Sequence, residues 1–139
     1  MSESDDLPPL LLCLDLEAGS RELACEAARY AARCHMPVRV VHVLQSPLDR
    51  RDRAGRLERL QALCHKLLPE VPETHIHLEE GVPEECIVAV AEHYSTGPIL
   101  LGRRRRQTVE RIYVGSTTSA VISLAQRPVL VIPLPVDHP

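Results

Sequence analysis

The sequence predicts an α/β fold, in which a doubly wound five-stranded parallel sheet carries helices on both faces. Along the 139 residues, short apolar runs alternate with amphipathic segments, a pattern typical of parallel strands joined by crossover helices. Aromatic residues make up 2% of the chain and Phe and Trp are absent, so the core must consist of Leu, Val, Ile and Ala. We expect residues 1–139 to form a single domain, with a flexible N-terminus over residues 1–8.

The first strand and the first helix are predicted from two neighbouring patterns. The apolar run over residues 10–14 indicates a buried strand that ends at Asp15. After a short loop, Gly19 and Ser20 introduce a helix, which is stopped by His35, Met36 and Pro37. The apolar residues of this helix recur at helical spacing and define one buried face: Leu23, Ala24, Ala27, Ala28, Ala31 and Cys34.

The second strand is predicted over residues 38–44 and the third over residues 74–78. Between them, Ser46 and Pro47 lead into one charged helix that continues to Pro69. The apolar face of this second helix consists of Leu57, Leu60, Cys64 and Leu67.

The third helix opens after Gly81, where Pro83 and two glutamates suit a first turn. The fourth strand is predicted over residues 98–101 and the fifth over residues 128–132, with a fourth helix between them. The expected buried faces are Ile87, Val90, Ala91 and Tyr94 in the third helix, and Thr117, Ala120, Val121 and Leu124 in the fourth.

The charge and the cysteine pattern argue against several classes of protein. The formal net charge is −3, so no overall positive field favours a nucleic acid or an anionic membrane. Five cysteines without a Cys-x-x-Cys pair predict a reduced, cytoplasmic setting in which they pack as small apolar residues. The acidic N-terminus lacks the pattern of a signal peptide, and no apolar run approaches the roughly 18 residues of a membrane span.

The most informative segment lies between the fourth strand and the fourth helix. Gly102 ends an apolar run, Gly115 precedes three hydroxyl residues, and four consecutive arginines from Arg103 to Arg106 lie between them. A glycine after a strand lets another group approach the backbone closely, and the N–H groups at a helix N-terminus attract anions. The pattern therefore predicts a phosphate site.

This segment resembles the ATP-binding motif of the universal stress protein family, Gly-x-x-Gly, nine residues, then Gly-Ser/Thr. Gly102 and the pair Gly115 and Ser116 match its outer positions, and the resemblance extends over residues 10–133. It includes Asp15, at a position where the family contacts ribose, and Val43, near which a backbone group of the family meets adenine.

The resemblance implies the strand order 3-2-1-4-5, in which the winding direction reverses between the first and fourth strands. It also implies a homodimer in which the fifth strands pair between Val129 and Ile132, and this apolar, uncharged edge favours pairing in its own right. The implied ligand is ATP, with or without Mg²⁺, or else AMP or another adenine nucleotide. Its candidate contacts are Leu14, Asp15, Val43, Leu101, Gly102, Arg104, Arg105, Gly115, Ser116, Thr117 and Thr118.

Arg105 stands where the family motif has its middle glycine. If the backbone there needs a positive φ, a residue other than glycine costs about 1–2 kcal/mol. A guanidinium that donates to a phosphate contributes about 1.5–3 kcal/mol in the opposite direction. Arg105 therefore either obstructs the phosphate site or binds the phosphate through its guanidinium.

Plain structural roles are open to the same residues. Asp15 could order the loop before the first helix, the two glycines could serve turns, and Ser116 and Thr117 could cap a helix. The four arginines could be a solvated charge run.

No catalytic triad, paired carboxylates or complete Walker loop is visible, so we predict no catalytic residue. His75 and His77 lack a third metal ligand, and we expect them at the surface or on an edge strand.

These patterns favour an adenine-nucleotide-binding regulatory protein of the stress response, acting on a regulatory protein partner that the sequence does not identify. The alternative is an interaction module that binds no nucleotide and docks an acidic partner on the loop from Arg103 to Arg106. A slow ATPase is a weaker alternative.

Overall fold

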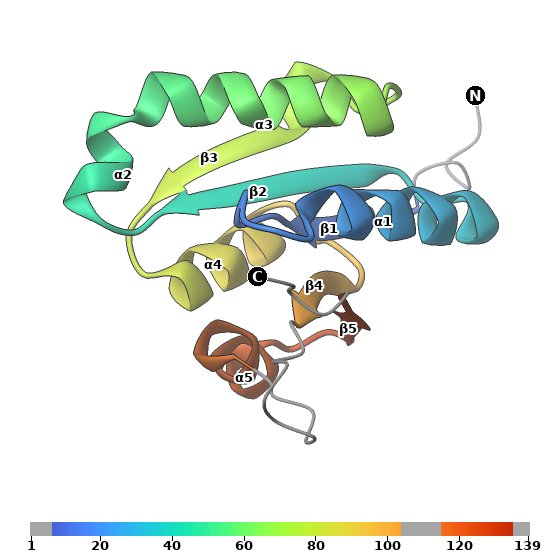
Figure 1. Cartoon of the computed structure of the whole chain (residues 1–139). Helices are drawn as coiled ribbons and strands as arrows, with labels where there is room; N and C mark the ends of the chain where they lie inside the picture. The colour runs from blue at the N-terminus through green and yellow to red at the C-terminus, as the bar shows by residue number, and fades with distance from the viewer. Residues whose placement is uncertain (1–6, 104–114, 135–139) are drawn as a thin grey trace.

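The computed structural model describes residues 7–103 and 115–134, which form one five-stranded sheet (Figure 1). The strand order is β3-β2-β1-β4-β5 and every neighbouring pair is parallel, so the predicted topology is confirmed. The strands are β1 (Leu10–Cys13), β2 (Val38–Leu44), β3 (Ile76–Glu80), β4 (Ile99–Arg103) and β5 (Val129–Pro133). Residues 1–6 of the expected flexible N-terminus lie outside the described residues.

The helices cover both faces of the sheet. They are α1 (Ser20–Cys34), α2 (Pro47–Arg51), α3 (Arg53–Leu67), α4 (Pro83–His93) and α5 (Ser116–Leu124), with a short 3-10 turn, η2 (Glu73–His75), before β3. Figure 1 shows α1 and α3 on one side of the sheet and α4 and α5 on the other. This three-layer arrangement is the α/β fold class that the alternating sequence pattern predicts.

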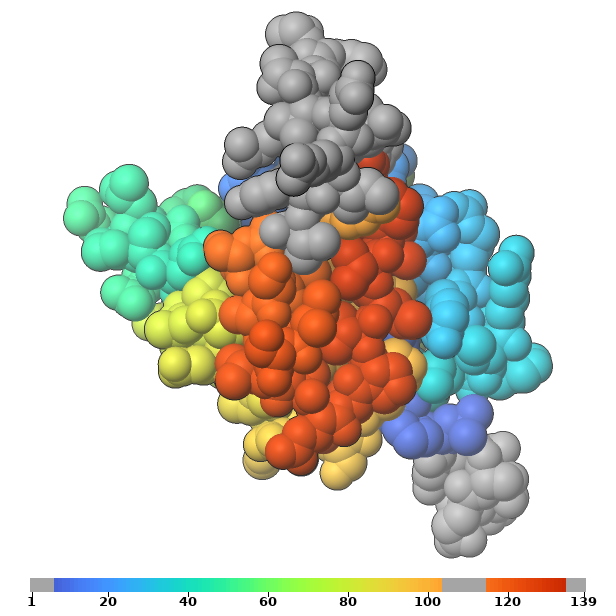
Figure 2. Space-filling model, turned by 90° about the horizontal axis from the view of Figure 1, so that it is seen from below, coloured from blue at the N-terminus to red at the C-terminus, as the bar shows by residue number. Residues whose placement is uncertain are grey.

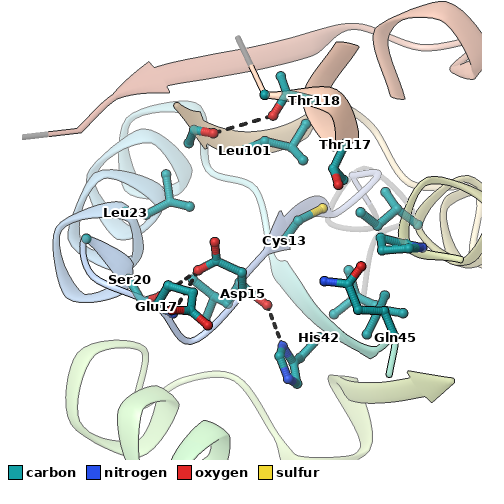
Figure 3. A pocket seen from close by; sticks show the side chains of 18 of the residues that line it. Cys13, Asp15, Glu17, Ser20, Leu23, His42, Gln45, Leu101, Thr117 and Thr118 are labelled. Atoms are coloured by element: carbon teal, nitrogen blue, oxygen red, sulfur yellow. Dashed lines mark hydrogen bonds between the residues drawn. The ribbon is translucent and has the colours of Figure 1, made fainter. Parts of the chain in front are cut away.

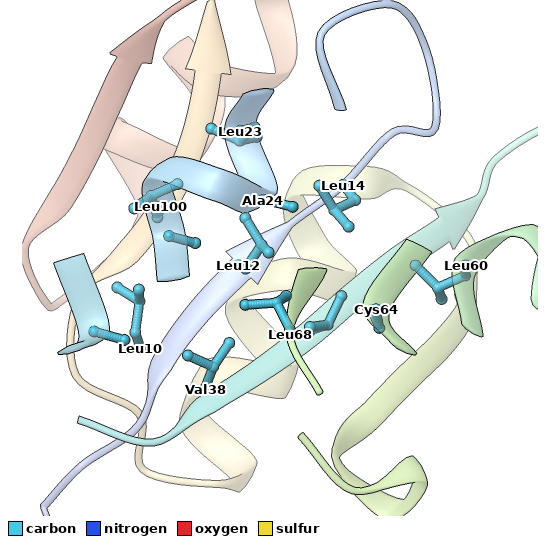
Figure 4. Close-up of a cluster of buried hydrophobic side chains, with 13 residues drawn as sticks. Leu10, Leu12, Leu14, Leu23, Ala24, Val38, Leu60, Cys64, Leu68 and Leu100 are labelled. Carbon is cyan, nitrogen blue, oxygen red and sulfur yellow. The ribbon is translucent and has the colours of Figure 1, made fainter. Parts of the chain in front are cut away.

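Successive residues of β1 supply the two layers of the core. Leu10 and Leu12 belong to a cluster with apolar residues of α1 and α3 (Figure 4), while Leu11 and Cys13 belong to a cluster with residues of α4 and α5. All four residues of β1 are buried. Because the strand is covered on both faces, it reads as a continuous apolar run rather than as an alternating one.

The single helix predicted between Ser46 and Pro69 is wrong, because the chain breaks into α2 and α3 at Asp52 (φ −97°, ψ 27°). A capping box formed by Ser46 and Asp49 starts α2, but α2 buries no residue. The core residues of this segment lie in α3, which is free to turn and lay its apolar face on the sheet.

Several strand boundaries differ from the prediction by one or two residues. β3 begins at Ile76 because residues 73–75 form a 3-10 turn after Pro72, and it continues through Glu80 opposite Leu44 of β2. β1 ends one residue early, although Leu14 still donates its N–H to the carbonyl oxygen of Val41 at 3.0 Å. Pairing with the neighbouring strand, rather than the apolar pattern, determines these ends.

Three residues predicted on buried helix faces are exposed. Tyr94 is 36% exposed and Leu124 is 49% exposed, and Cys34 is also exposed. Each is the last residue or the C-terminal cap of its helix. The helical spacing therefore overestimates burial at the end of a helix.

His77 lies on β3, an edge strand of the sheet, as predicted, but its side chain is buried rather than at the surface. His77 is 9% exposed, its ring lies 4.6 Å from the ring of Tyr94, and its Nε2 accepts a hydrogen bond from Arg39 at 2.9 Å. The Arg39 guanidinium also lies 3.9 Å from the centre of the Tyr94 ring, within cation–π distance. Burial lowers the pKa of His77, and the charges of Arg39, His75 and His93 lower it further.

We expect this cluster to make the fold less stable in acid. Because the pKa of His77 is lower in the folded protein than its ordinary value of 6.5, the unfolded chain binds more protons as the pH falls. The contribution of neutral His77 is fully present above the unfolded pKa and is lost as the pH falls through the folded one. The free energy of unfolding, measured with urea, should fall less steeply below about pH 6.5 in His77→Gln than in the wild type.

The control for this prediction is His65→Gln, since His65 is exposed on α3. His42 and His75 also have lowered pKa values, so the slope should be reduced rather than abolished. An equal pH slope in His77→Gln and the wild type would contradict the prediction.

Candidate functional site

A cleft of about 830 Å³ lies at the carboxyl ends of β1, β2 and β4 (Figure 3). This is the edge of the sheet at which the winding direction reverses, because β2 and β4 lie on opposite sides of β1. The first residues of α1, α4 and α5 complete its walls. The volume is within the range of about 300–1,000 Å³ that small-molecule sites occupy.

The cleft brings together all nine of the predicted site residues that the structure describes. They are Leu14, Asp15, Val43, Leu101, Gly102, Gly115, Ser116, Thr117 and Thr118. Arg103, the first of the four arginines, also lines it. Arg104 and Arg105 lie outside the described residues, so their predicted contacts stay predictions from sequence.

Asp15 lies at the mouth of the cleft and also orders the loop before α1. Its Oδ1 accepts hydrogen bonds from the backbone N–H of Glu17 at 2.9 Å and from the hydroxyl of Ser20 at 3.3 Å (Figure 3). Asp15 therefore has the structural role that the sequence left open, which is to order the loop before α1. These hydrogen bonds also hold its exposed carboxylate beside the end of β1.

The N-terminus of α5 forms the opposite wall, and no side chain among the described residues caps it. Gly115 is the N-cap residue, so Ser116 and Thr117 are inside the helix and do not have the capping role considered for them. The hydroxyl of Thr118 donates to the carbonyl oxygen of Gly102 at 3.5 Å, which ties the start of α5 to the end of β4 (Figure 3). Uncapped N–H groups and the positive end of the helix dipole face this side of the cleft.

The two motif glycines differ in their surroundings. A Cβ at Gly102 would lie 2.7 Å from Cδ1 of Leu134, so a side chain there would displace the end of the Leu134 side chain. Gly115 has a φ of −65°, which any residue adopts, and no described atom lies within 4 Å of a Cβ built at this position. Neither backbone conformation nor packing among the described residues explains glycine at position 115.

A polar network that the sequence analysis missed supports the β2 side of the cleft. The Nδ1–H of His42 donates to the carbonyl oxygen of Leu14 at 2.8 Å, and its Nε2 accepts from Nη1 of Arg56 at 3.2 Å. His42 is 2% exposed, and burial lowers its pKa. The neutral imidazole therefore holds the end of β1 in place next to Asp15.

Arg56 extends this network to α2. Its Nη2 lies 2.7 Å from Oδ1 of Asp49, and both side chains are mostly buried. Burial alone would raise the pKa of the Asp49 carboxyl, but the N–H of Gln45 and the Arg56 guanidinium outweigh it and lower that pKa. The Nε of Arg56 is buried and has no hydrogen-bond partner among the described residues, so this wall retains one unsatisfied donor.

The sequence held only a partial signal for these residues. Ser46 and Asp49 have the spacing of a capping box, which marks the start of α2. Arg56 reaches the cleft because the chain breaks at Asp52, and no local pattern predicted that break. The pocket lining also contains Cys13, whose thiol stays protonated because burial raises its pKa.

The described residues contain no group of three His, Cys, Asp or Glu side chains that could hold a metal ion. Within the same ranges, 7–103 and 115–134, we find no helix with the length and apolar character needed to cross a membrane.

Comparisons with known proteins identify the family. Its model, described as the universal stress protein family, matches residues 8–133. Universal stress protein E from Escherichia coli strain K12 is 34% identical over 80 residues, which are 58% of this chain and only 25% of that longer relative.

Two solved structures have the same fold. A universal stress protein from Archaeoglobus fulgidus gives a TM-score of 0.71 at 24% identity and covers 90% of this chain and 98% of its own. The universal stress protein from Archaeoglobus fulgidus in complex with dAMP gives a TM-score of 0.64 at 22% identity, with 90% and 97% covered. The match of the family model over residues 8–133 shows that this chain belongs to the universal stress protein family.

Proposed function

We propose that this protein binds an adenine nucleotide, ATP with or without Mg²⁺, in the cleft and acts as a dimeric, cytoplasmic regulator of the stress response. The observation that carries the proposal is the wall formed by α5. Nothing among the described residues requires glycine at position 115. Gly115 also precedes the N-terminus of α5, which faces the cleft and has no side-chain cap among those residues. A phosphate group that approaches the backbone there would account for both features.

Each side of the cleft matches one part of a nucleotide. The Asp15 carboxylate is a suitable acceptor for ribose hydroxyls, and the backbone near Val43 offers hydrogen-bonding groups to adenine. Leu14 and Leu101 provide apolar surface beside them. The phosphates would meet the N–H groups that follow Gly115, while Arg104 and Arg105 are phosphate contacts proposed from sequence. One related structure, the Archaeoglobus fulgidus protein, was solved in complex with dAMP.

We assign no general base, and this favours a regulatory role over catalysis. Both ring nitrogens of His42 are used in hydrogen bonds, and the thiol of Cys13 is buried and protonated. A bound nucleotide would therefore be held rather than rapidly hydrolysed, and the slow ATPase stays a weaker alternative.

Nucleotide binding can be tested by isothermal titration calorimetry of ATP and Mg²⁺ into protein free of co-purified nucleotide. We expect saturable micromolar binding at one site per chain. Asp15→Asn should weaken binding about tenfold or more, because a hydrogen bond to a charged group contributes about 1.5–3 kcal/mol. The asparagine oxygen can still accept from the Glu17 N–H, so the loop should stay ordered.

Ser20→Ala is the matched control, since it removes the hydroxyl that contacts the same Asp15 oxygen but takes no part in the proposed ribose contact. Its affinity should stay within about twofold of the wild type. If the wild type shows no heat up to millimolar ATP, the nucleotide proposal fails. The loop from Arg103 to Arg106 then becomes the surface to search for an acidic partner.

Dimerisation is proposed through β5, which pairs with β4 on one side and has an open edge among the described strands. Figure 2 shows β5 and α5 at the surface of this side of the molecule. Most of β5 is only partly buried, and Val131 belongs to neither core cluster. An apolar edge strand of this kind is protected when a second copy pairs with it.

We expect Val131→Lys to convert a dimer into a monomer at micromolar concentration, measured by light scattering, because the added charge would be buried at the strand pair. Ile122→Lys is the control, since Ile122 is 49% exposed on α5 and the change adds the same charge. A wild-type protein with monomeric mass would rule out the dimer.

A further inference from the structure

Leu134 lies against two glycines that are far apart in the sequence. A Cβ built at Gly19, in the loop before α1, would lie 2.9 Å from Cδ1 of Leu134. A Cβ built at Gly102, in β4, would lie 2.7 Å from the same methyl carbon. Distances this short do not occur for real Cβ atoms, so both positions must lack a side chain for Leu134 to lie where it does.

The position of Leu134 follows from the pairing of β4 with β5. Arg103 pairs with Pro133, the last residue of β5, and the Leu134 N–H then donates to the Arg103 carbonyl oxygen at 2.8 Å. Leu130, Ile132 and Leu134 all pack against the core cluster between the sheet and α1. Leu134 differs from the other two because it also lines the main cleft.

This contact involves Gly102, one of the two glycines that the sequence motif assigns to the phosphate site. The Gly102 carbonyl oxygen accepts from Thr118 at the start of α5, and the space that a Gly102 Cβ would occupy is taken by Leu134. A phosphate that reaches the Gly102 backbone must therefore share this space with an isobutyl group. An apolar group against phosphate oxygens is unfavourable because the oxygens lose hydrogen bonds to water.

We propose that Leu134 is a gating residue of the nucleotide site: its side chain covers Gly102 and Gly19 and must rotate away before phosphate groups can reach Gly102. This inference rests on the proposed function, since it assumes that the cleft takes a nucleotide. The first atom that both glycines meet is a terminal methyl carbon, so a change of rotamer is enough to move it. Leu134 thereby selects against phosphate-bearing ligands without affecting the adenosine part.

The test compares ATP with adenosine, which lacks the phosphates, by calorimetry on the wild type, Leu134→Ala and Leu130→Ala. Leu134→Ala should bind ATP at least about fivefold more tightly than the wild type and bind adenosine with unchanged affinity. Leu130→Ala is the matched control, because it makes the same truncation on the same face of β5 but Leu130 does not line the cleft. It should leave both affinities unchanged.

The outcomes separate the gate from the nucleotide site. If the wild type binds ATP and Leu134→Ala binds it equally or more weakly, the gate is refuted and nucleotide binding stands. If neither protein binds ATP or adenosine, the proposed function fails and the gate fails with it. If the wild type binds ATP and Leu134→Ala binds it more tightly while adenosine affinity is unchanged, the gate is supported.

A second measurement tests the contact without any ligand. Gly102 does not have a positive φ, so the strain in Gly102→Ala comes from Leu134 rather than from the backbone. Gly102→Ala should therefore destabilise the wild type to urea more than it destabilises Leu134→Ala. Equal destabilisation in the two backgrounds would overturn the contact on which the gate depends.

Discussion

The burial of β1 is the constraint on which the rest of this structure depends. The strand pairs with β2 on one side and β4 on the other, and its four residues are buried by helices on both faces. Helices must therefore cover β1 on both faces, and α1 and α3 cover one side while α4 and α5 cover the other. The carboxyl end of β1 is the point where these two layers separate. Asp15, just beyond that end, consequently lies at the mouth of a cleft rather than under a helix.

The cleft persists because its walls are held by polar contacts as well as by apolar packing. His42 holds the Leu14 carbonyl from β2, and Arg56 connects His42 to Asp49 at the start of α2. Buried hydrogen bonds of this kind contribute modestly when made but cost about 1–3 kcal/mol when one partner is lost. The network therefore stabilises the observed positions of the carboxyl ends of β1 and β2. On the opposite wall, the bond from Thr118 to Gly102 is the corresponding tie between α5 and β4.

Local patterns predicted the fold and much of the cleft, and they failed where a contact joins distant segments. The apolar runs and helix-starting residues predicted the five strands, and the family resemblance supplied the strand order that brings Asp15, Gly102 and Gly115 to one edge of the sheet. The break at Asp52 was missed because no local residue pattern marks it, and the residues that the two helices bury all lie in α3. The position of His77 on an edge strand was predicted, but its burial was not, because that burial depends on Arg39 and Tyr94 from other elements.

Two different close contacts can each account for a glycine at position 102, and the sequence motif does not distinguish between them. The motif explains it by a phosphate, whereas in this structure the close approach is made by Leu134, from the segment that follows β5. Both explanations need the same missing Cβ, so a glycine at this position alone is weak support for a phosphate site. Gly115 is more informative, since neither its φ nor any described neighbour requires glycine. If a ligand explains Gly115, then Leu134 and that ligand meet at the same end of β4, and the state of Leu134 becomes part of the binding equilibrium.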